Sequence, residues 1–284
     1  MTHVVIMAGG IGSRLFPLST PEHPKQFLDL LGGGRTMIQM TCDRFRTAYP
    51  GAEFWVVTSA EYVHFVVEQL PDIPLDHILS EPVPRSTAPC IAYASWKIAM
   101  KDPSGCMIVT PADAYVPDYK AFSETVVMAS DFAVSRRAMV CLGISPSSPH
   151  TGYGYIRMGG KASEGIFDVE SFKEKPDLQT AERYLADGGF LWNAGIFVWR
   201  VETILRELRT YVPQICSVMD ALKPVMGTPE ESEALEALFP TCDKISIDYA
   251  VMEKSDAVFV APGDWFWSDL GNFEALEAVK KVGP

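Results

Sequence analysis

Residues 1–18 read MTHVVIMAGGIGSRLFPL, and this stretch predicts the class of fold. The apolar run Val4–Ala8 is typical of a buried strand, and it stops at Gly9 and Gly10. Glycines directly after a strand let backbone N–H groups converge on a phosphate, because no Cβ stands in the way. In an open α/β sheet this loop lies beyond the carboxyl end of the strand, where ligands bind. The opening therefore predicts an anion site.

The rest of the first half alternates short apolar runs with segments of helical period. The strand-like runs are residues 4–8, 54–58, 78–79, 107–110 and 138–144. Segments of helical period cover residues 37–49, 60–70, 87–100 and 122–134, the first two behind the cap residues Thr36 and Ser59. This alternation predicts an α/β layered fold whose largely parallel sheet is flanked by helices.

The pattern changes after about residue 150. Strand-like runs cover residues 153–158, 167–172, 191–198 and 257–261. Helical segments are expected at residues 177–187, 201–208, 230–238 and 248–254. We interpret this half as an elaboration of the same sheet that lines the other side of one cleft.

Composition excludes several classes of protein. The chain has 284 residues and a formal net charge of −12, whereas nucleic-acid binders concentrate positive charge. No apolar run approaches the roughly 20 residues of a membrane helix, and the N-terminus lacks the features of a signal peptide. The six cysteines show no C-x-x-C spacing, so we expect free buried thiols in a reducing cytoplasm. A local site for a small anion stays compatible with these numbers.

The glycine-rich loop matches neither of the two common phosphate-binding fingerprints. It lacks the G-x-x-x-x-G-K-[ST] pattern of a P-loop, and Leu15 stands where the dinucleotide fingerprint requires a third small residue. The loop is instead followed by Arg14 and, eleven residues later, by Lys25. Arg offers a two-pronged donor to phosphate oxygens, and Lys a mobile point charge.

The segment AGGIGSRLFPLSTPEHPKQFLDL, residues 8–30, resembles the signature of the sugar-nucleotide pyrophosphorylases. Six further segments agree with that family in order: EPVPRSTAP (81–89), TPAD (110–113), TGYGYI (151–156), FKEKP (172–176), WNAGIF (192–197) and WSDLG (267–271). The resemblance spans residues 3 to about 275. Within the family, these segments are most similar to the members that make GDP-mannose from GTP and mannose 1-phosphate.

The resemblance implies a Rossmann-like, glycosyltransferase-A-like catalytic domain over residues 1–284, with no appended β-helix or isomerase domain evident. Residues 1–150 would bind the nucleotide and residues 151–284 the sugar phosphate. The implied reaction is Mg²⁺-dependent in-line attack of the sugar 1-phosphate on the α-phosphorus of GTP, which releases pyrophosphate. The nucleophile is already an anion, which agrees with the absence of a convincing nucleophile–base triad in the sequence.

The resemblance also assigns roles to individual residues. Arg14, Lys25 and Asp113 would be catalytic, and Asp113 and Asp269 would hold Mg²⁺. The residues implied in nucleotide binding are Ala8, Gly9, Gly10, Gly12, Ser13, Arg14, Glu81, Arg85, Thr87, Ala88 and Pro111. Those implied in binding the sugar phosphate are Gly154, Glu174, Lys175, Asn193 and Gly195.

Three residues depart from the family pattern and leave alternatives open. Phe16 replaces a common Trp, Ser86 a frequent Asn, and Ala114 a frequent His. A pyrophosphorylase for another pair, such as glucose 1-phosphate with UTP or dTTP, is a second reading. A non-catalytic regulator that binds GDP-mannose is a third, and Ala114 is the residue that keeps it open. A homodimer is compatible with the sequence, which carries no mark of oligomeric state.

Overall fold

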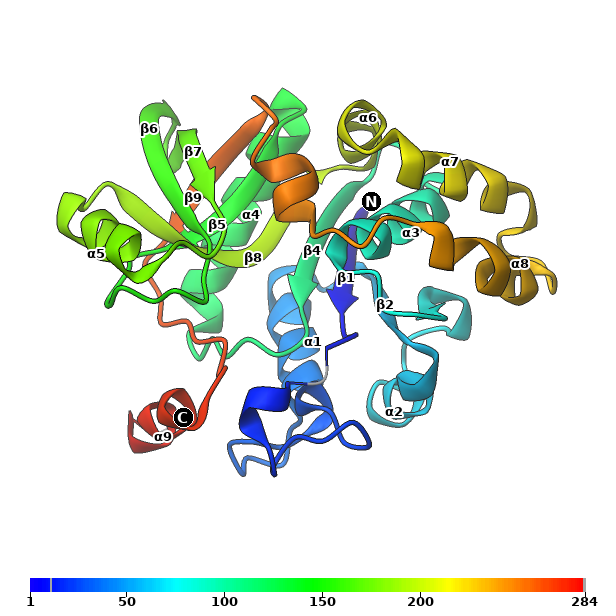
Figure 1. Cartoon of the computed structure of the whole chain (residues 1–284), viewed down its shortest axis with the longest axis horizontal. Helices are drawn as coiled ribbons and strands as arrows, with labels where there is room; N and C mark the ends of the chain where they lie inside the picture. Colours follow the sequence, from blue (N-terminus) through cyan, green and yellow to red (C-terminus); the bar gives the residue numbers. More distant parts are fainter. Residues whose placement is uncertain (11, 283–284) are drawn as a thin grey trace.

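The computed structural model describes residues 1–10 and 12–282, and one nine-stranded sheet forms its centre (Figure 1). Ile11, which belongs to the expected phosphate loop, lies outside the described residues. The strands are β1 (Thr2–Met7), β2 (Glu53–Ser59), β3 (Ile78–Glu81), β4 (Cys106–Pro111), β5 (Met139–Ile144), β6 (Tyr155–Ser163), β7 (Ile166–Lys173), β8 (Phe190–Arg200) and β9 (Val258–Gly263).

Nine α-helices are described around this sheet. They are α1 (Met37–Ala48), α2 (Val63–Gln69), α3 (Thr87–Ala99), α4 (Tyr119–Arg136), α5 (Leu178–Asp187), α6 (Val201–Tyr211), α7 (Pro213–Leu222), α8 (Glu231–Leu238) and α9 (Phe273–Val282). All strand-like runs of the sequence are strands here, which confirms the predicted α/β fold. Helices α7 and α9 were not predicted. Pro213 looks like the end of the preceding helix, yet proline is equally at home as the first residue of a new one.

The strand order is β3-β2-β1-β4-β8-β5-β9-β7-β6. Strands β3, β2, β1 and β4 pair in parallel, and so do β5 and β9. Strand β8 runs antiparallel to β4 and β5, and β7 antiparallel to β9 and β6. Of the described strands, β7 and β8 therefore run against the others, so the sheet is mixed and mostly parallel, as predicted.

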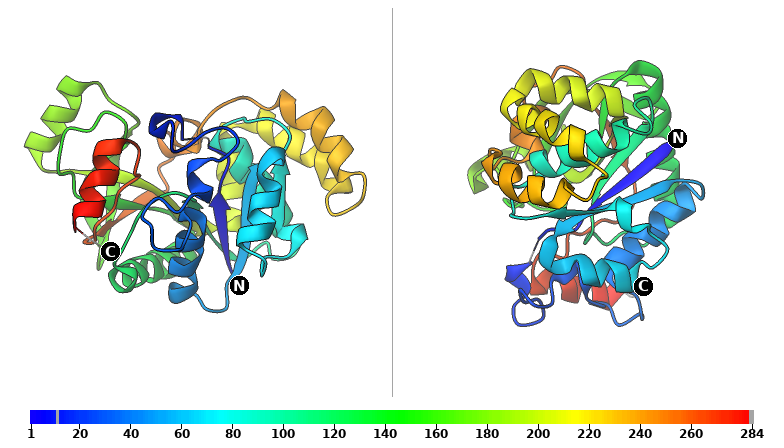
Figure 2. Two further views of the ribbon diagram at one scale, coloured as in Figure 1. Left: turned by 90° about the horizontal axis from the view of Figure 1, so that it is seen from below. Right: turned by 90° about the vertical axis from the view of Figure 1, so that its right-hand side faces the viewer.

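Alternating residues of the central strands bury the two faces of the sheet. On β4, Met107 and Val109 join one apolar cluster, whereas Ile108 joins the other. Helices α3, α6, α7 and α8 contribute to the first cluster, and α1, α2 and α4 to the second. Figure 2 shows these two helical layers on either side of the sheet.

Strand β8 joins the two halves of the sheet. Its second half pairs with β4, its first half pairs with β6, and β5 pairs with both halves, so β8, β5, β9, β7 and β6 close into a ring. Tyr155 at the start of β6 pairs with both Trp192 of β8 and Lys173 of β7. The end of β7 is thereby brought beside the first half of β8.

Two further features of the described residues bear on the sequence predictions. No described helix combines the length and apolarity needed to cross a membrane. All six cysteines are free and buried, as their spacing predicted.

We predict that Phe197→Ala lowers the free energy of unfolding by about 3–5 kcal/mol, because it opens a cavity in the core. Phe197 on β8 is 2% exposed and stacks on Trp199 with ring centroids 5.7 Å apart. Denaturant unfolding monitored by circular dichroism measures the change. Leu178→Ala, at a side chain that is 55% exposed, is the control and is expected to cost less than about 0.5 kcal/mol. Equal effects of the two substitutions would contradict the central place of β8.

Candidate active site

The loop after β1 is held by hydrogen bonds at its carbonyl oxygens. The buried Gln26 amide donates from Nε2 to the carbonyl oxygens of Ala8 at 2.9 Å and Gly10 at 2.8 Å. The Ala8 carbonyl also accepts from the Thr58 hydroxyl at 2.9 Å. Gly9 and Gly10 follow at the carboxyl end of β1.

Gly12 lets the loop approach Lys25. Its φ of 69° is in the left-handed region, and a Cβ there would lie 2.6 Å from the Lys25 Cβ. Gly12 precedes a short 3₁₀ helix, Ser13–Leu15, which leaves Ser13 and Arg14 exposed and buries Leu15. A second 3₁₀ helix, Lys25–Phe27, presents Lys25 from the other side.

The Lys25 ammonium group is buried between two segments that are distant in sequence. Its side chain is 4% exposed and donates from Nζ to Asp113 Oδ2 at 2.9 Å. Nζ also donates to the carbonyl oxygen of Asp269. The buried charge is therefore both paired and hydrogen-bonded, as burial requires.

The Asp269 carboxylate is oriented from both sides. Its Oδ1 accepts from the Tyr153 hydroxyl at 2.7 Å and from the Gly271 N–H at 3.0 Å. Its Oδ2 lies 3.6 Å from Arg14 Nη2, and the Arg14 side chain is 64% exposed. Burial and the Asp269 charge raise the pKa of Tyr153, so this hydroxyl stays a donor at neutral pH.

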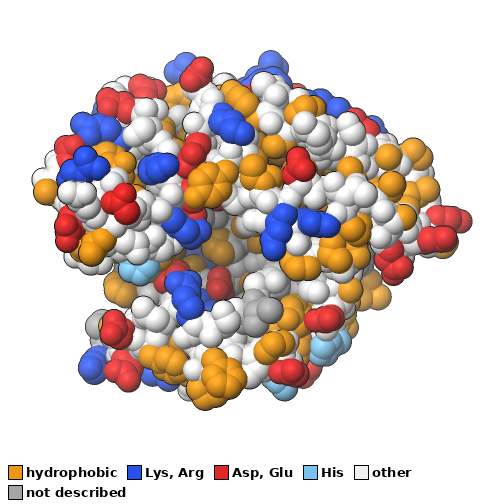
Figure 3. All heavy atoms as spheres, viewed as in Figure 1, with side chains coloured by type: hydrophobic (Ala, Val, Ile, Leu, Met, Phe, Trp, Pro, Cys, Tyr) orange, Lys and Arg blue, Asp and Glu red, His pale blue; other side chains and the backbone are white. Residues whose placement is uncertain are grey.

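These groups surround a cavity of about 160 Å³. Its lining includes Gly12, Arg14, Lys25, Pro111, Asp113, Ala114, Trp267, Asp269 and Gly271. Figure 3 shows a hollow on this face, in which Lys and Arg side chains lie beside Asp and Glu side chains. The cavity thus combines anion-binding cations with carboxylates.

The carboxylates of the cavity decide what kind of metal site the chain can offer. Within residues 1–10 and 12–282, no group of three or more His, Cys, Asp or Glu side chains could hold a metal ion. Asp113 and Asp269 therefore do not form a closed protein site. A pair of carboxylates fits Mg²⁺, because this ion keeps several waters and shares its coordination shell with substrate phosphates. The residues present are compatible with Mg²⁺ delivered together with a phosphate ligand.

Glu81 is the last residue of β3, and its strand ends at the same edge of the sheet as β1, which the glycine loop follows. Its side chain is 7% exposed, and Oε1 has no hydrogen-bond partner within the described residues. Oε2 lies 3.5 Å from where a Cβ of Gly9 would be. Burial raises the pKa of Glu81 to about 8. The carboxyl group is thus buried, unpaired and directed at the loop that β1 presents.

The other residues expected on the nucleotide side are held by protein contacts. Arg85 donates from Nη2 to the Pro240 carbonyl. Thr87 begins α3, and its hydroxyl accepts from the Ile247 N–H at 2.8 Å. The Ala88 side chain is fully buried and its N–H donates to the Ile245 carbonyl at 3.1 Å. Arg85, Thr87 and Ala88 therefore anchor α3 to residues 240–247.

The expected sugar-phosphate residues converge where β6, β7 and β8 meet. A Cβ on Gly154 would lie 2.6 Å from Glu174 Oε2, so the Glu174 carboxylate packs directly on that glycine. Glu174 is 7% exposed and accepts a hydrogen bond from the Lys175 ammonium group. Lys175 remains 59% exposed. Burial alone would lower the pKa of Lys175, but the hydrogen bond and the charge of Glu174 outweigh it and raise the pKa.

A bulge in β8 orients Asn193. The pairing with β5 shifts between Cys141 and Gly143, opposite Gly195, whose φ is +71°. Asn193 accepts from the Gly195 N–H at 3.0 Å and donates from its backbone N–H to the Gly154 carbonyl at 2.8 Å. Bulges near sites commonly re-aim a side chain in this way. A Cβ on Gly195 would lie 3.8 Å from Pro111, so this glycine of β8 lies close to the end of β4.

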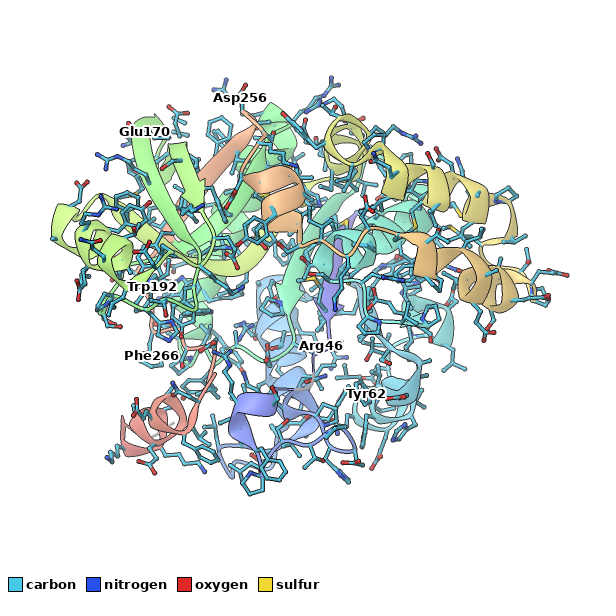
Figure 4. All side chains as sticks on the ribbon, in the orientation of Figure 1. Arg46, Tyr62, Glu170, Trp192, Asp256 and Phe266 are labelled. Atoms are coloured by element: carbon cyan, nitrogen blue, oxygen red, sulfur yellow. The ribbon has the colours of Figure 1, made fainter. Side chains whose placement is uncertain are left out.

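The sequence analysis missed three residues of this site. Gln26 was named only as part of the segment of residues 8–30, although its position next to Lys25 could have marked it as a site residue. Tyr153 packs edge-on against Trp192, labelled in Figure 4, and Trp267, with ring centroids 5.0 Å apart in each pair. Asp248 accepts from Asn193 Nδ2 at 3.0 Å and was predicted only as part of a helix. No local pattern marks Tyr153 or Asp248 as site residues.

Comparison with known proteins identifies the family of this chain. Residues 3–282 match the nucleotidyl transferase family. Mannose-1-phosphate guanylyltransferase of Escherichia coli strain K12 is 39% identical over 285 residues, which cover 96% of this chain and 58% of that protein. The alginate biosynthesis protein AlgA of Pseudomonas aeruginosa is 37% identical, with 96% of this chain and 57% of that protein covered. The chain therefore spans less than two thirds of the length of these relatives.

The chain matches a larger share of one solved structure than of these relatives. The crystal structure of mannose-1-phosphate geranyltransferase from Thermus thermophilus superposes with a TM-score of 0.87 at 33% identity, and covers 98% of this chain and 78% of that one. The likeness extends over both the glycine-loop half and the half that carries Asn193. Together with the family match, it shows that the chain belongs to the nucleotidyl transferase family.

Proposed function

We propose that this chain forms GDP-mannose and pyrophosphate from GTP and mannose 1-phosphate. A phosphate oxygen of the sugar attacks the α-phosphorus of GTP, and the bond to the β-phosphate breaks. One P–O bond forms and one breaks, so pyrophosphate carries away the leaving electron pair. The observation that carries this proposal is the buried Lys25 ammonium group, paired with Asp113 beside the glycine loop.

The residues would act by alignment and by neutralising charge. Arg14 is exposed at the cavity, where it would turn from Asp269 toward the leaving pyrophosphate, and Lys25 lines the same cavity. Lys25 would contact the α-phosphate and the attacking phosphate together. Holding two anions in line accounts for roughly 7–11 kcal/mol of a typical barrier. No nucleophilic side chain is needed, because the attacking phosphate is already ionised.

Asp113 and Asp269 would hold Mg²⁺, whose charge would neutralise phosphate oxygens during transfer. The protein's own part is to orient these two carboxylates. Lys25 holds Asp113, whereas Tyr153 and the Gly271 N–H hold Asp269. Fixed carboxylates lose little freedom when the ion arrives with GTP, which favours binding of the pair.

Glu81 would select the base. An ionised carboxylate accepts two hydrogen bonds, and the N1–H and 2-amino groups of guanine donate two side by side. The other nucleobases lack this pair of adjacent donors. The unpaired Oε1 atom and its burial support the assignment. Gly9 and Gly10 leave room for the nucleotide to approach the backbone.

Glu174, Lys175 and Asn193 would bind the sugar phosphate. The carboxylate can accept from two neighbouring sugar hydroxyls, and the exposed ammonium group can contact the phosphate. The assay that tests the whole proposal measures pyrophosphate release with Mg²⁺ over a grid of nucleoside triphosphates and sugar 1-phosphates. Release with GTP and mannose 1-phosphate above every other pair is expected. A different best pair identifies another pyrophosphorylase, and no release anywhere supports a regulatory protein.

Lys25→Ala and the nearly isosteric Lys25→Met are predicted to lower turnover by about two or three orders of magnitude while the fold survives. Both remove the cation that is buried at the junction of the two substrates. Initial rates of pyrophosphate release and circular dichroism check the two halves of the prediction. Lys161→Met, at an exposed lysine, is the matched control. Near-normal turnover of the Lys25 variants would refute the assignment.

Asp113→Asn is predicted to raise the Mg²⁺ concentration needed for half-maximal activity by about tenfold or more, because a neutral amide is a poorer ligand. A Mg²⁺ titration at saturating GTP gives this value directly. The control is Asp131→Asn, at an exposed carboxylate on α4. If the Mg²⁺ dependence of Asp113→Asn equals that of the control, Asp113 does not bind the ion.

Glu81→Gln is predicted to reduce the preference for GTP over other nucleoside triphosphates by about tenfold, because its amide faces two donors. In the wild-type chain, Glu81 is ionised only above its raised pKa of about 8. The KM for GTP should therefore fall as the pH rises from about 7 to about 9. That slope should vanish in Glu81→Gln, and a slope shared by both proteins would contradict the role.

A further inference from the structure

Asp248 lies beside Asn193, one of the residues proposed to bind the sugar phosphate, in a residue range that the proposed reaction does not use. It opens a π-helical turn, Asp248–Met252, that follows the segment bound to the start of α3. Its side chain is half-buried. It reaches β8, where it accepts from Asn193 Nδ2 at 3.0 Å.

The Asn193 amide is consequently held at both ends. Its Oδ1 accepts from the Gly195 N–H at 3.0 Å, while Nδ2 donates to Asp248 Oδ1. An ionised carboxylate can only accept, and a backbone N–H can only donate. The amide therefore has one allowed orientation. One N–H and one lone pair remain to meet a ligand in a defined arrangement.

Several titratable groups face Asp248. Glu174 and Lys175 approach from the end of β7, Tyr249 is adjacent on the same turn, and Cys141 faces it from β5. Burial and then the charge of Glu174 raise the pKa of Asp248 to about 7. Lys175 is bonded to Glu174, and its charge also lies near enough to Asp248 to favour the ionised carboxylate.

Backbone hydrogen bonds hold the turn that Asp248 begins. The backbone N–H groups of Ala250 and Glu253 donate to the carbonyls of Ser246 and Asp248 at 2.9 Å each. The preceding segment is tied to α3 through the Thr87 hydroxyl and the Ala88 N–H. The Asp248 carboxylate also accepts hydrogen bonds within this turn, from its own backbone N–H and from the Ser246 side chain, so it links the turn to Asn193.

We infer that Asp248 is a positioning residue for the sugar phosphate: its carboxylate holds the Asn193 amide in the orientation that reads the sugar hydroxyls. The inference rests on the proposed function, because it assigns Asn193 to the sugar. Asp248 touches no substrate in this scheme. It acts on affinity for the sugar phosphate and leaves the nucleotide side unchanged.

Steady-state kinetics with each substrate varied in turn tests the inference. Asp248→Ala should raise the KM for mannose 1-phosphate by about tenfold or more, and change the KM for GTP by less than about twofold. Asp248→Asn should restore the sugar KM to within about threefold of wild type at alkaline pH, because its Oδ1 can still accept from Asn193. Asp256→Ala is the control, at an exposed carboxylate labelled in Figure 4 well away from Trp192.

A pH profile supplies a readout that a purely structural role would not move. The hydrogen bond to Asn193 is charge-assisted only when Asp248 is ionised, above about pH 7. The wild-type KM for mannose 1-phosphate should therefore rise as the pH falls from about 8 to about 6. The rise should be smaller in Asp248→Asn, and ionisation of the substrate phosphate affects both proteins alike.

Binding of GDP-mannose, measured by isothermal titration calorimetry, needs no turnover and separates the two ideas. Wild-type protein that neither turns over nor binds GDP-mannose overturns the proposed function and this inference with it. Wild-type activity or binding that Asp248→Ala leaves unchanged overturns the inference alone. So does an equal loss for both substrates in Asp248→Ala together with a wild-type pH profile in Asp248→Asn.

Discussion

The buried ammonium group of Lys25 ties together three segments that are far apart in the chain. It meets the Asp113 carboxylate after β4 and the Asp269 carbonyl after β9, while Gly12 packs on its stem. A buried charge is tolerated only with such partners, and removing one would leave the others uncompensated. The glycine loop, the end of β4 and the C-terminal segment must therefore assemble around one point, which is where the proposed transfer takes place.

Strand β8 supplies the residues on the other side of the proposed site. It runs against β4 and crosses from the parallel half of the sheet into the ring that β5, β9, β7 and β6 complete. Its bulge at Gly195 brings that residue close to Pro111, and Asn193 beside the bulge is bonded to Gly195 and Asp248. The net charge of −12 does not oppose an anionic ligand here, since local cations face the cavity and two carboxylates can share a cation with phosphates.

Much of the fold follows from local patterns. Alternating and continuous apolar runs marked each described strand, and Thr36 is the cap residue of α1. Helix α7 was not predicted, because Pro213 can mark either the end of one helix or the start of the next. The site roles of Gln26, Tyr153 and Asp248 were not predicted for another reason. Their roles consist of contacts with Ala8, Asp269 and Asn193, across 18, 116 and 55 positions, and no spacing rule connects such pairs.

The amino-acid sequence by itself determined the strands and most helices, and which residue types could meet phosphate, because periodicity and side-chain chemistry are local properties. The resemblance to the pyrophosphorylase family added the expected roles of individual residues, because seven segments follow one another in the order found in that family. Only the tertiary structure decided that Lys25 is buried between Asp113 and Asp269, that Glu81 Oε1 has no partner among the described residues, and that Asp248 accepts from Asn193. These facts depend on strand register, on one bulge and on burial, and each arises when segments distant in sequence pack together.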